Sequence, residues 1–184
     1  MNAAIEGDFR FDFSSARVER LDRPEITMPQ GMSLVDFVIE EGSRLMLLVE
    51  IKDPSRAPRS THPSAQTAIE KSRGEFVRSL ETDKLLSEDL VPKARDSYTY
   101  LHLMRRDHTR MIYVVLLGAE KLSVDPALLL NFKDRLLARI RQEAHEPWQR
   151  DYIADCVVVT ERDWADAFPN YPLVRLSNTI DALA

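Results

Sequence analysis

The sequence predicts an α/β fold in which helices flank a mixed central sheet. Short apolar runs rich in Val, Ile and Leu recur at residues 33–40, 44–52, 111–118 and 153–160, and such runs are typical of buried strands. Segments with helical spacing of apolar residues separate the later runs. This alternation of strand and helix favours right-handed crossovers onto one shared sheet.

The N-terminal third is predicted to contain three strands and one short helix. Three phenylalanines alternate with charged residues between positions 9 and 13, which indicates a short strand. Residues 14–22 are expected to form a short helix capped by its two serines, before prolines and a glycine break the chain. Residues 33–40 and 44–52 then form two strands joined by a hairpin turn at 40–43.

The remainder alternates between helices and strands. The proline-rich stretch 53–64 has no periodicity and is predicted to be a loop. Further helices are expected over about 65–80, over about 88–106 with Pro92 in the first turn, from the Asp125-Pro126 start, and around Trp164. A last extended piece is expected near 173–176.

Composition limits the class of protein. At 184 residues and 21.2 kDa the chain is expected to form a single domain over residues 1–184. The lone Cys156 excludes an internal disulfide and is predicted to be a buried thiol. The sequence shows no secretory leader pattern and no apolar run of membrane-spanning length, so a cytoplasmic location is expected.

Charge bears on the partners of the protein. A net charge of −5 opposes a free-standing DNA-binding protein of high affinity, because phosphate neutralisation needs a basic surface. An enzyme with metal-binding acids, or a subunit whose partner supplies the grip, is compatible with that charge. The four histidines show no zinc-site spacing, and no phosphate-binding glycine loop is found.

The predicted hairpin brings three charged residues together. Asp36 and Glu50 are equidistant from position 43, inside the turn, so they should be cross-strand neighbours with Cβ atoms about 4.5–5.5 Å apart. Lys52 shares the face of Glu50 because side chains alternate along a strand. Their neighbours are apolar, and burying unpaired charge is costly. The alternative is an ordinary amphipathic hairpin with a solvated polar face.

Two carboxylates this close suit a hard divalent cation such as Mg²⁺ or Mn²⁺. Asp36, Glu50 and the main-chain carbonyl of Ile51 are the expected ligands. The ion would polarise a phosphodiester and lower the pKa of a bound water. Lys52 would orient or deprotonate the nucleophile, or stabilise the developing charge.

These residues resemble the restriction-endonuclease-like, or PD-(D/E)XK, nuclease superfamily. The match consists of Val35-Asp36, 13 intervening residues and Glu50-Ile51-Lys52, and it covers residues 33–54. Val35 stands where the family usually has proline. The resemblance implies an αβββαβ core and a Mg²⁺-dependent nuclease that cuts DNA.

The resemblance also suggests auxiliary residues. A further acid from the first helix often assists metal binding, and Glu19, followed by Asp22, is the candidate here. A polar or basic residue often follows on a later helix, and Gln66 on the first helix competes with the stretch 93–97 on the second. Lys93 is preferred as the catalytic one, because a lysine opposite the apolar face of a helix can reach a scissile phosphate. The loop arginines Arg56 and Arg59, together with Gln66, would contact nucleic acid; ordinary solvated surface is the alternative for each.

Two classes of function follow. The first is a metal-dependent nuclease hydrolysing DNA phosphodiesters, as a subunit of a bacterial defence or mobile-element system; that setting comes from the resemblance alone, and RNA is an alternative substrate. The second is a catalytically inactive nuclease-fold interaction subunit of a larger complex. In either case a protein partner or a homodimer is expected to supply specificity.

Overall fold

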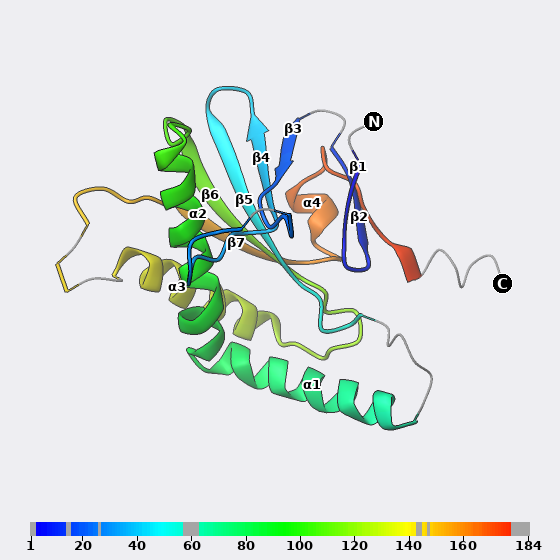
Figure 1. Cartoon of the computed structure of the whole chain (residues 1–184). Coiled ribbons are helices and arrows are strands. Elements are labelled where there is room, and N and C mark those ends of the chain that lie inside the picture. Colours follow the sequence, from blue (N-terminus) through cyan, green and yellow to red (C-terminus); the bar gives the residue numbers. More distant parts are fainter. Residues whose placement is uncertain are drawn as a thin grey trace.

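The computed structural model describes residues 3–13, 16–25, 27–56, 63–142, 145–146 and 148–177. It has a mixed α/β architecture with its strands grouped in two sheets (Figure 1). The elements are β1 (Ala3–Glu6), β2 (Phe9–Asp12), β3 (Arg17–Arg20), β4 (Phe37–Glu41), β5 (Leu45–Lys52), α1 (Pro63–Glu81), the π-helical turn η1 (Leu86–Leu90), α2 (Val91–Leu103), β6 (Arg110–Leu117), α3 (Pro126–Arg141), β7 (Asp155–Thr160), α4 (Trp164–Ala167) and β8 (Leu173–Arg175).

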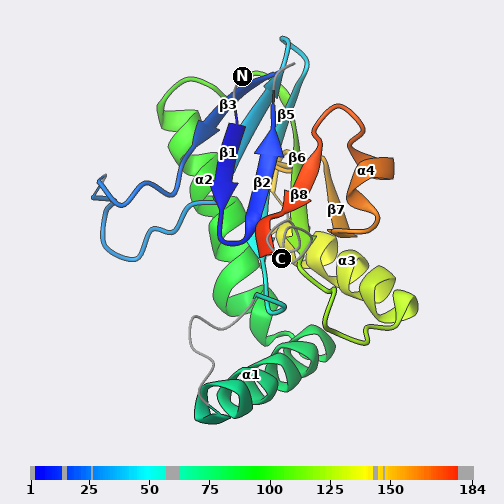
Figure 2. The same cartoon turned by 90° about the vertical axis from the view of Figure 1, so that its right-hand side faces the viewer.

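The larger sheet has the strand order β3-β4-β5-β6-β7. The first three strands pair antiparallel, and β5, β6 and β7 run parallel to one another. A smaller antiparallel sheet, β1-β2-β8, and helix α4 lie on one face of the large sheet, while α2 and α3 lie on the other (Figure 2). The carboxyl ends of the three parallel strands therefore meet at one edge, where ligands of α/β proteins commonly bind.

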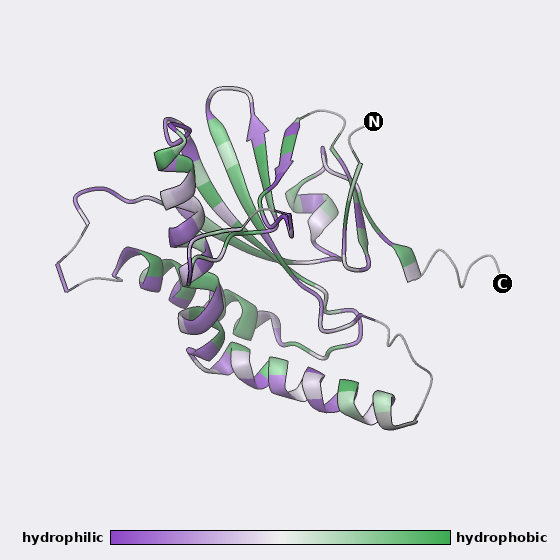
Figure 3. Ribbon diagram, viewed as in Figure 1, coloured by the Kyte–Doolittle hydropathy of each residue, from purple (hydrophilic) through white to green (hydrophobic). Residues whose placement is uncertain are grey.

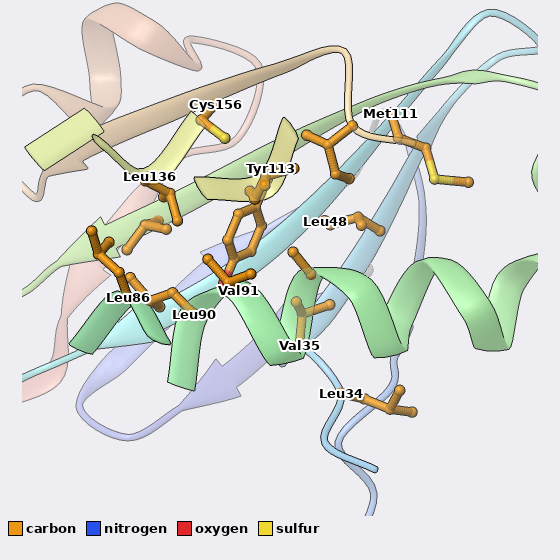
Figure 4. Packing of buried hydrophobic residues seen from close by; sticks show 14 of the residues in the cluster. Leu34, Val35, Leu48, Leu86, Leu90, Val91, Met111, Tyr113, Leu136 and Cys156 are labelled. Carbon is orange, nitrogen blue, oxygen red and sulfur yellow. The ribbon is translucent and has the colours of Figure 1, made fainter. Parts of the chain in front are cut away.

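Alternation along the strands divides the interior into two cores. Val38, Leu48 and Tyr113 face the helices, where they pack with residues of η1, α2 and α3 (Figure 4). Phe37 and Val49 point the opposite way, into an aromatic core built with the small sheet and α4. Because β4, β5 and β6 are covered on both faces, they are apolar along most of their length (Figure 3).

The predicted hairpin is present, with one boundary shifted. β5 (Leu45–Lys52) nearly coincides with the expected strand 44–52, whereas β4 (Phe37–Glu41) begins four residues after the expected start of the strand 33–40, so Asp36 precedes the strand. The turn between them includes Gly42 at a positive φ of 61°. The predicted helix over 88–106 is present as η1 followed by α2, with Pro92 in the first turn of α2. Cys156 on β7 is fully buried, and burial raises the pKa of its thiol to about 12, so the predicted buried thiol is confirmed.

The helix predicted over residues 14–22 is wrong. Residues 17–20 form strand β3, which pairs antiparallel with β4; Ser14 and Ser15 lie outside the described residues. Without β3 the hydrogen-bonding edge of β4 would be open, and pairing with it overrides the local helical pattern. Within the described ranges only β1 and β2 precede β3, so the leading helix implied by an αβββαβ order is not found there.

None of the helices in the described residues is both long enough and apolar enough to cross a lipid bilayer. The longest, α1, spans 19 residues, and most of its side chains are exposed. It packs against α3 near its C-terminal end, and Leu80 is its fully buried residue among those described (Figure 1).

Alanine substitutions at two glycines are expected to change the free energy of unfolding in opposite directions. A Cβ added at Gly118 would lie 2.1 Å from Asp53 Oδ1, whose carboxylate Arg175 holds, whereas one at Gly74 in α1 would meet nothing within 4 Å. Gly118→Ala should therefore lower the free energy of unfolding by about 1–3 kcal/mol. Gly74→Ala should raise it by roughly 0.5–1 kcal/mol. Urea unfolding midpoints measure both, and a neutral Gly118→Ala would contradict the packing described.

Candidate functional site

The hairpin register places Asp36 opposite Glu50. Phe37 pairs with Val49 at the end of the β4–β5 ladder, so the next positions outward are 36 and 50. The Ile51 N–H donates to Asp36 Oδ2 over 2.7 Å, which ties the two chains together at this point. Glu50 shares the strand face of Leu48 and therefore points towards the helices. Asp36 directly precedes β4, and the charges of Glu50 and Lys93 both act on it.

Glu50 has the most restrictive surroundings of any acid in the hairpin. Its side chain is 1% exposed, and its Oε1 accepts from Lys52 Nζ at 2.8 Å and from Lys93 Nζ at 2.7 Å. Its Oε2 is buried and has no hydrogen-bond partner in the described part of the chain. Lys52 also pairs with Asp89 of η1. We refer to Asp36, Glu50, Lys52, Asp89 and Lys93 as the Asp36–Glu50 site.

One face of η1 and α2 organises both strands. Besides Asp89 and Lys93, it presents Asp96, whose Oδ2 accepts from the Ser33 N–H at 3.0 Å. The buried Ser97 Oγ accepts from the Val35 N–H at 2.9 Å. These two bonds fix the segment that leads into Asp36. The sequence analysis preferred Lys93 to Asp96 and Ser97 within the candidate stretch 93–97, and it did not identify Asp89. The spacing of Asp89, Asp96 and Ser97 from Lys93 (four, three and four residues) places them on one helical face.

The charges of the site shift the pKa of Asp36. Burial and then the negative charge of Glu50 raise the pKa of Asp36 to about 7, against the opposing effects of Lys93 and the Ile51 N–H. Burial by itself lowers the pKa of Lys52, but the charges and hydrogen bonds of Glu50 and Asp89 outweigh it and raise the pKa. Two ammonium groups balance two carboxylates, so a proton on Asp36 leaves the site neutral.

A buried tyrosine borders the same group. Tyr113 of β6 lies opposite Leu48 in the parallel ladder and is fully buried (Figure 4). Burial, followed by the charge of Glu50, raises the pKa of its phenol well above the ordinary value. Its hydroxyl has no hydrogen-bond partner among the described residues. The hydroxyl is therefore a neutral group at physiological pH.

The structure does not bring Glu19 into the site. Glu19 lies on β3 rather than on a helix, and both of its carboxylate oxygens are engaged: Oε1 with Arg23 at 2.6 Å and Oε2 with Arg106 at 2.6 Å. The proposed role of Glu19 as a metal ligand therefore has no geometric support. The other candidate from this segment, Asp22, is exposed.

The candidate nucleic-acid contacts lie outside the Asp36–Glu50 site. Arg56 is exposed in the loop after β5, Gln66 is exposed near the start of α1, and Arg59 lies outside the described residues. Arg73 of α1, which the sequence analysis did not select, donates to the carbonyl oxygens of Pro54 at 3.1 Å and Ser55 at 3.4 Å. This arginine joins α1 to the loop that follows Lys52.

A second buried ionic cluster fixes the residue after Lys52. The Arg175 guanidinium on β8, with a side chain 5% exposed, pairs with Asp53 at 3.0 Å, Asp8 at 3.2 Å and Glu161 at 3.2 Å. Burial raises the pKa of Asp53, and Arg175 opposes that shift. The cluster connects β8 to the carboxyl end of β5, and so limits the movement of the backbone at Lys52.

The residues present fit a cation of the Mg²⁺ type. Among the described residues no group of three or more His, Cys, Asp or Glu side chains is arranged to hold a metal ion. Mg²⁺ does not need one, since it is often bound by one or two carboxylates together with waters and substrate phosphates. Such an ion would use Asp36 and the neighbouring Glu50 Oε2, which is buried and has no hydrogen-bond partner among the described residues.

The raised pKa of Asp36 has a consequence for stability in the metal-free protein. A carboxyl whose pKa rises from 3.8 to about 7 on folding holds its proton more tightly when folded. The tighter proton binding stabilises the folded state; this stabilisation is complete below about pH 4 and is lost as pH rises through 7. In the presence of a chelator, Asp36→Asn should therefore gain stability over wild type between pH 4 and 8, on the order of 4 kcal/mol. Urea unfolding across this range measures the difference; parallel profiles would contradict the assignment.

Comparison of this chain with protein-family models, with curated proteins and with solved structures finds no match. A function therefore has to be inferred from the chemistry of the Asp36–Glu50 site.

Proposed function

We propose that this protein is a metal-dependent nuclease that hydrolyses DNA phosphodiester bonds. The observation that supports this best is the state of Glu50. One carboxylate oxygen is held by two lysines, and the other is buried near Asp36 with no hydrogen-bond partner in the part of the chain that the structure describes. A donor of this kind is suited to a divalent cation. The resemblance of Asp36 and Glu50-Ile51-Lys52 to the PD-(D/E)XK pattern points to the same chemistry.

The arrangement of strands supports the finer fold assignment within this proposal. β3, β4 and β5 form an antiparallel meander, and β6 joins it in parallel after a helical connection. That is the order expected of the βββαβ portion of a restriction-endonuclease-like core, with the first acid at the start of the second strand of the meander and the Glu-x-Lys at the end of the third.

The cost of burial argues against a purely structural role for these groups. A buried ion pair is often no more stabilising than apolar residues of similar volume, and an unsatisfied carboxylate oxygen adds a penalty of about 1–3 kcal/mol. An interaction subunit without catalytic activity would have no ligand to offset this free-energy penalty at Glu50. A site that presents a free carboxylate oxygen to a ligand can offset it.

Each residue has a defined task in this scheme. Asp36 and Glu50 would hold Mg²⁺ or Mn²⁺, an ion that, once bound, supplies charge neutralisation and lowers the pKa of a coordinated water. Lys52, held from the strand as an ammonium group, orients the attacking water by its hydrogen bonds. Lys93, presented from α2, stabilises negative charge on the phosphate oxygens. The apolar core around them excludes bulk water, which strengthens these interactions.

The acidic charge of the chain indicates how substrate is engaged. With a net charge of −5, the protein has little long-range attraction for DNA. A protein partner or a second copy of the chain is therefore proposed to supply grip and specificity, within a bacterial defence or mobile-element system. Arg56, exposed in the loop that follows β5, is a candidate for a phosphate contact from this chain.

Cleavage of plasmid and oligonucleotide DNA tests the proposal, with structured and single-stranded RNA as competing substrates. Asp36→Asn, Glu50→Gln and Lys52→Ala should each lower the cleavage rate at least 100-fold, and a chelator should abolish cleavage. Lys93→Ala should lower it less, by roughly 10-fold, because it removes one of two cationic groups.

Glu75→Gln and Lys71→Ala are matched controls. These two residues form an exposed pair on α1, so their substitution removes the same kinds of charge away from the site. Both variants should cut like wild type. Survival of cleavage in all three site variants would show that the chemistry lies elsewhere. Absence of cleavage on every substrate, with candidate partners added, would favour the alternative of an inactive interaction subunit.

A further inference from the structure

The two lysines of the site are anchored differently. Lys93 Nζ has Glu50 as its ion-pair partner in the described part of the chain. Lys52 Nζ lies between two carboxylates, those of Glu50 and Asp89. The charge of Lys93 also acts on Asp36. A cation that takes up the charge of both Asp36 and Glu50 therefore leaves Lys93 without an anchor among the described residues, but leaves Lys52 with Asp89.

The π-helical turn explains how Asp89 reaches Lys52. In η1 the Val91 N–H donates to the Leu86 carbonyl, a bond one residue longer than in an α-helix. Leu86 and Leu90 are both fully buried against the sheet. With the extra residue, Leu86 and Leu90 both stay in the core while the Asp89 carboxylate reaches Lys52 at the end of β5. π-turns of this kind are frequent at functional sites.

The ion pair between Asp89 and Lys52 is partly shielded from solvent. Their side chains are 29% and 21% exposed, so water and salt screen the pair less than a pair on the open surface. The neighbouring acid Glu88 differs: its side chain is 66% exposed, and its nearest cation, Lys84, lies 4.0 Å away. Two adjacent acids in one turn thus differ in whether they touch the site.

We propose that Asp89 is a positioning residue that keeps Lys52 in the site when a cation takes up the charge of Glu50, while Lys93 is released to meet the substrate phosphate. This inference rests on the proposed function and divides the work between two lysines that look equivalent around Glu50. Lys52 stays beside the attacking water, held from the side opposite Glu50. Lys93 moves to the phosphate that arrives.

Lysine ammonium signals in ¹H–¹⁵N NMR spectra test the anchoring without any activity, because a salt-bridged ammonium exchanges slowly enough to be seen. Every variant in this test also carries Asp36→Asn, so that Asp36 cannot replace Glu50 as the partner of Lys93. Added to it, Glu50→Gln mimics a site whose two acids are neutralised by a cation. In this variant the Lys52 signal should persist and the Lys93 signal should be lost. In Glu50→Gln/Asp89→Asn both should be lost, whereas Glu50→Gln/Glu88→Gln should match Glu50→Gln. Loss of both signals in Glu50→Gln alone, with backbone amide spectra intact, would overturn the proposal.

Kinetics test the catalytic consequence. Asp89→Asn should lower kcat on the order of 10- to 100-fold with little change in KM, since it misplaces a group without removing it. Asp89→Glu should recover part of the loss, and Glu88→Gln should cut like wild type. In a Lys52→Ala background, Asp89→Asn should have no further effect. Additive effects of the two substitutions would show that Asp89 acts otherwise than through Lys52.

The two tests separate the two claims. If the wild type cuts no nucleic acid, the proposed function fails, and the NMR signals still decide whether Asp89 holds Lys52 independently of Glu50. If the wild type cuts DNA but Asp89→Asn changes neither kcat nor the Lys52 signal, the function stands and the role assigned to Asp89 is wrong.

Discussion

Glu50 is a carboxylate that the protein keeps almost completely out of water, and its ionic partners determine much of the surrounding structure. Two ammonium groups meet on one of its oxygens, one arriving from two residues along the same strand and the other from helix α2. An isolated charge in this position would be strongly disfavoured. Helix α2 must therefore lie close enough for Lys93 to reach the strand end.

The same helix serves the other half of the site. Asp96 and Ser97 bind the backbone N–H groups of Ser33 and Val35, so the segment entering Asp36 is fixed to α2 as well. Asp36 and Glu50 are consequently set against each other by a rigid element and not only by their hairpin. The raised pKa of Asp36 is the electrostatic result of this forced proximity in a buried place.

Much of this arrangement could be predicted from the sequence, and the reason is local. The turn-centred symmetry of Asp36 and Glu50 follows from strand pairing across a short hairpin, and the period of two places Lys52 on the face of Glu50. The resemblance suggested a polar or basic residue on a later helix, and Lys93 was preferred because a lysine opposite the apolar face of that helix can reach a phosphate. The contact with Glu50 shows that α2 does approach the strand end.

The residues that were missed depend on contacts between distant segments. Strand β3 forms because β4 offers it a hydrogen-bonding edge, which no local pattern reveals. Glu19 therefore lies on a strand, where it pairs with Arg106 rather than with a metal site. Asp89 requires a π-turn, whose extra residue has no sequence signature that we recognise. Arg175 lies 122 positions after Asp53, so the cluster that holds the end of β5 appears only in the folded chain.

Crystals of the protein soaked in Mn²⁺ and examined by anomalous diffraction would test the central claim most directly. The account predicts an anomalous peak at Asp36 and Glu50 Oε2, the carboxylate oxygen that has no hydrogen-bond partner within the described ranges. In that state Lys52 should remain at Asp89. Crystals with no peak at this position, in which both lysines stay on Glu50 at high Mn²⁺ concentration, would contradict it.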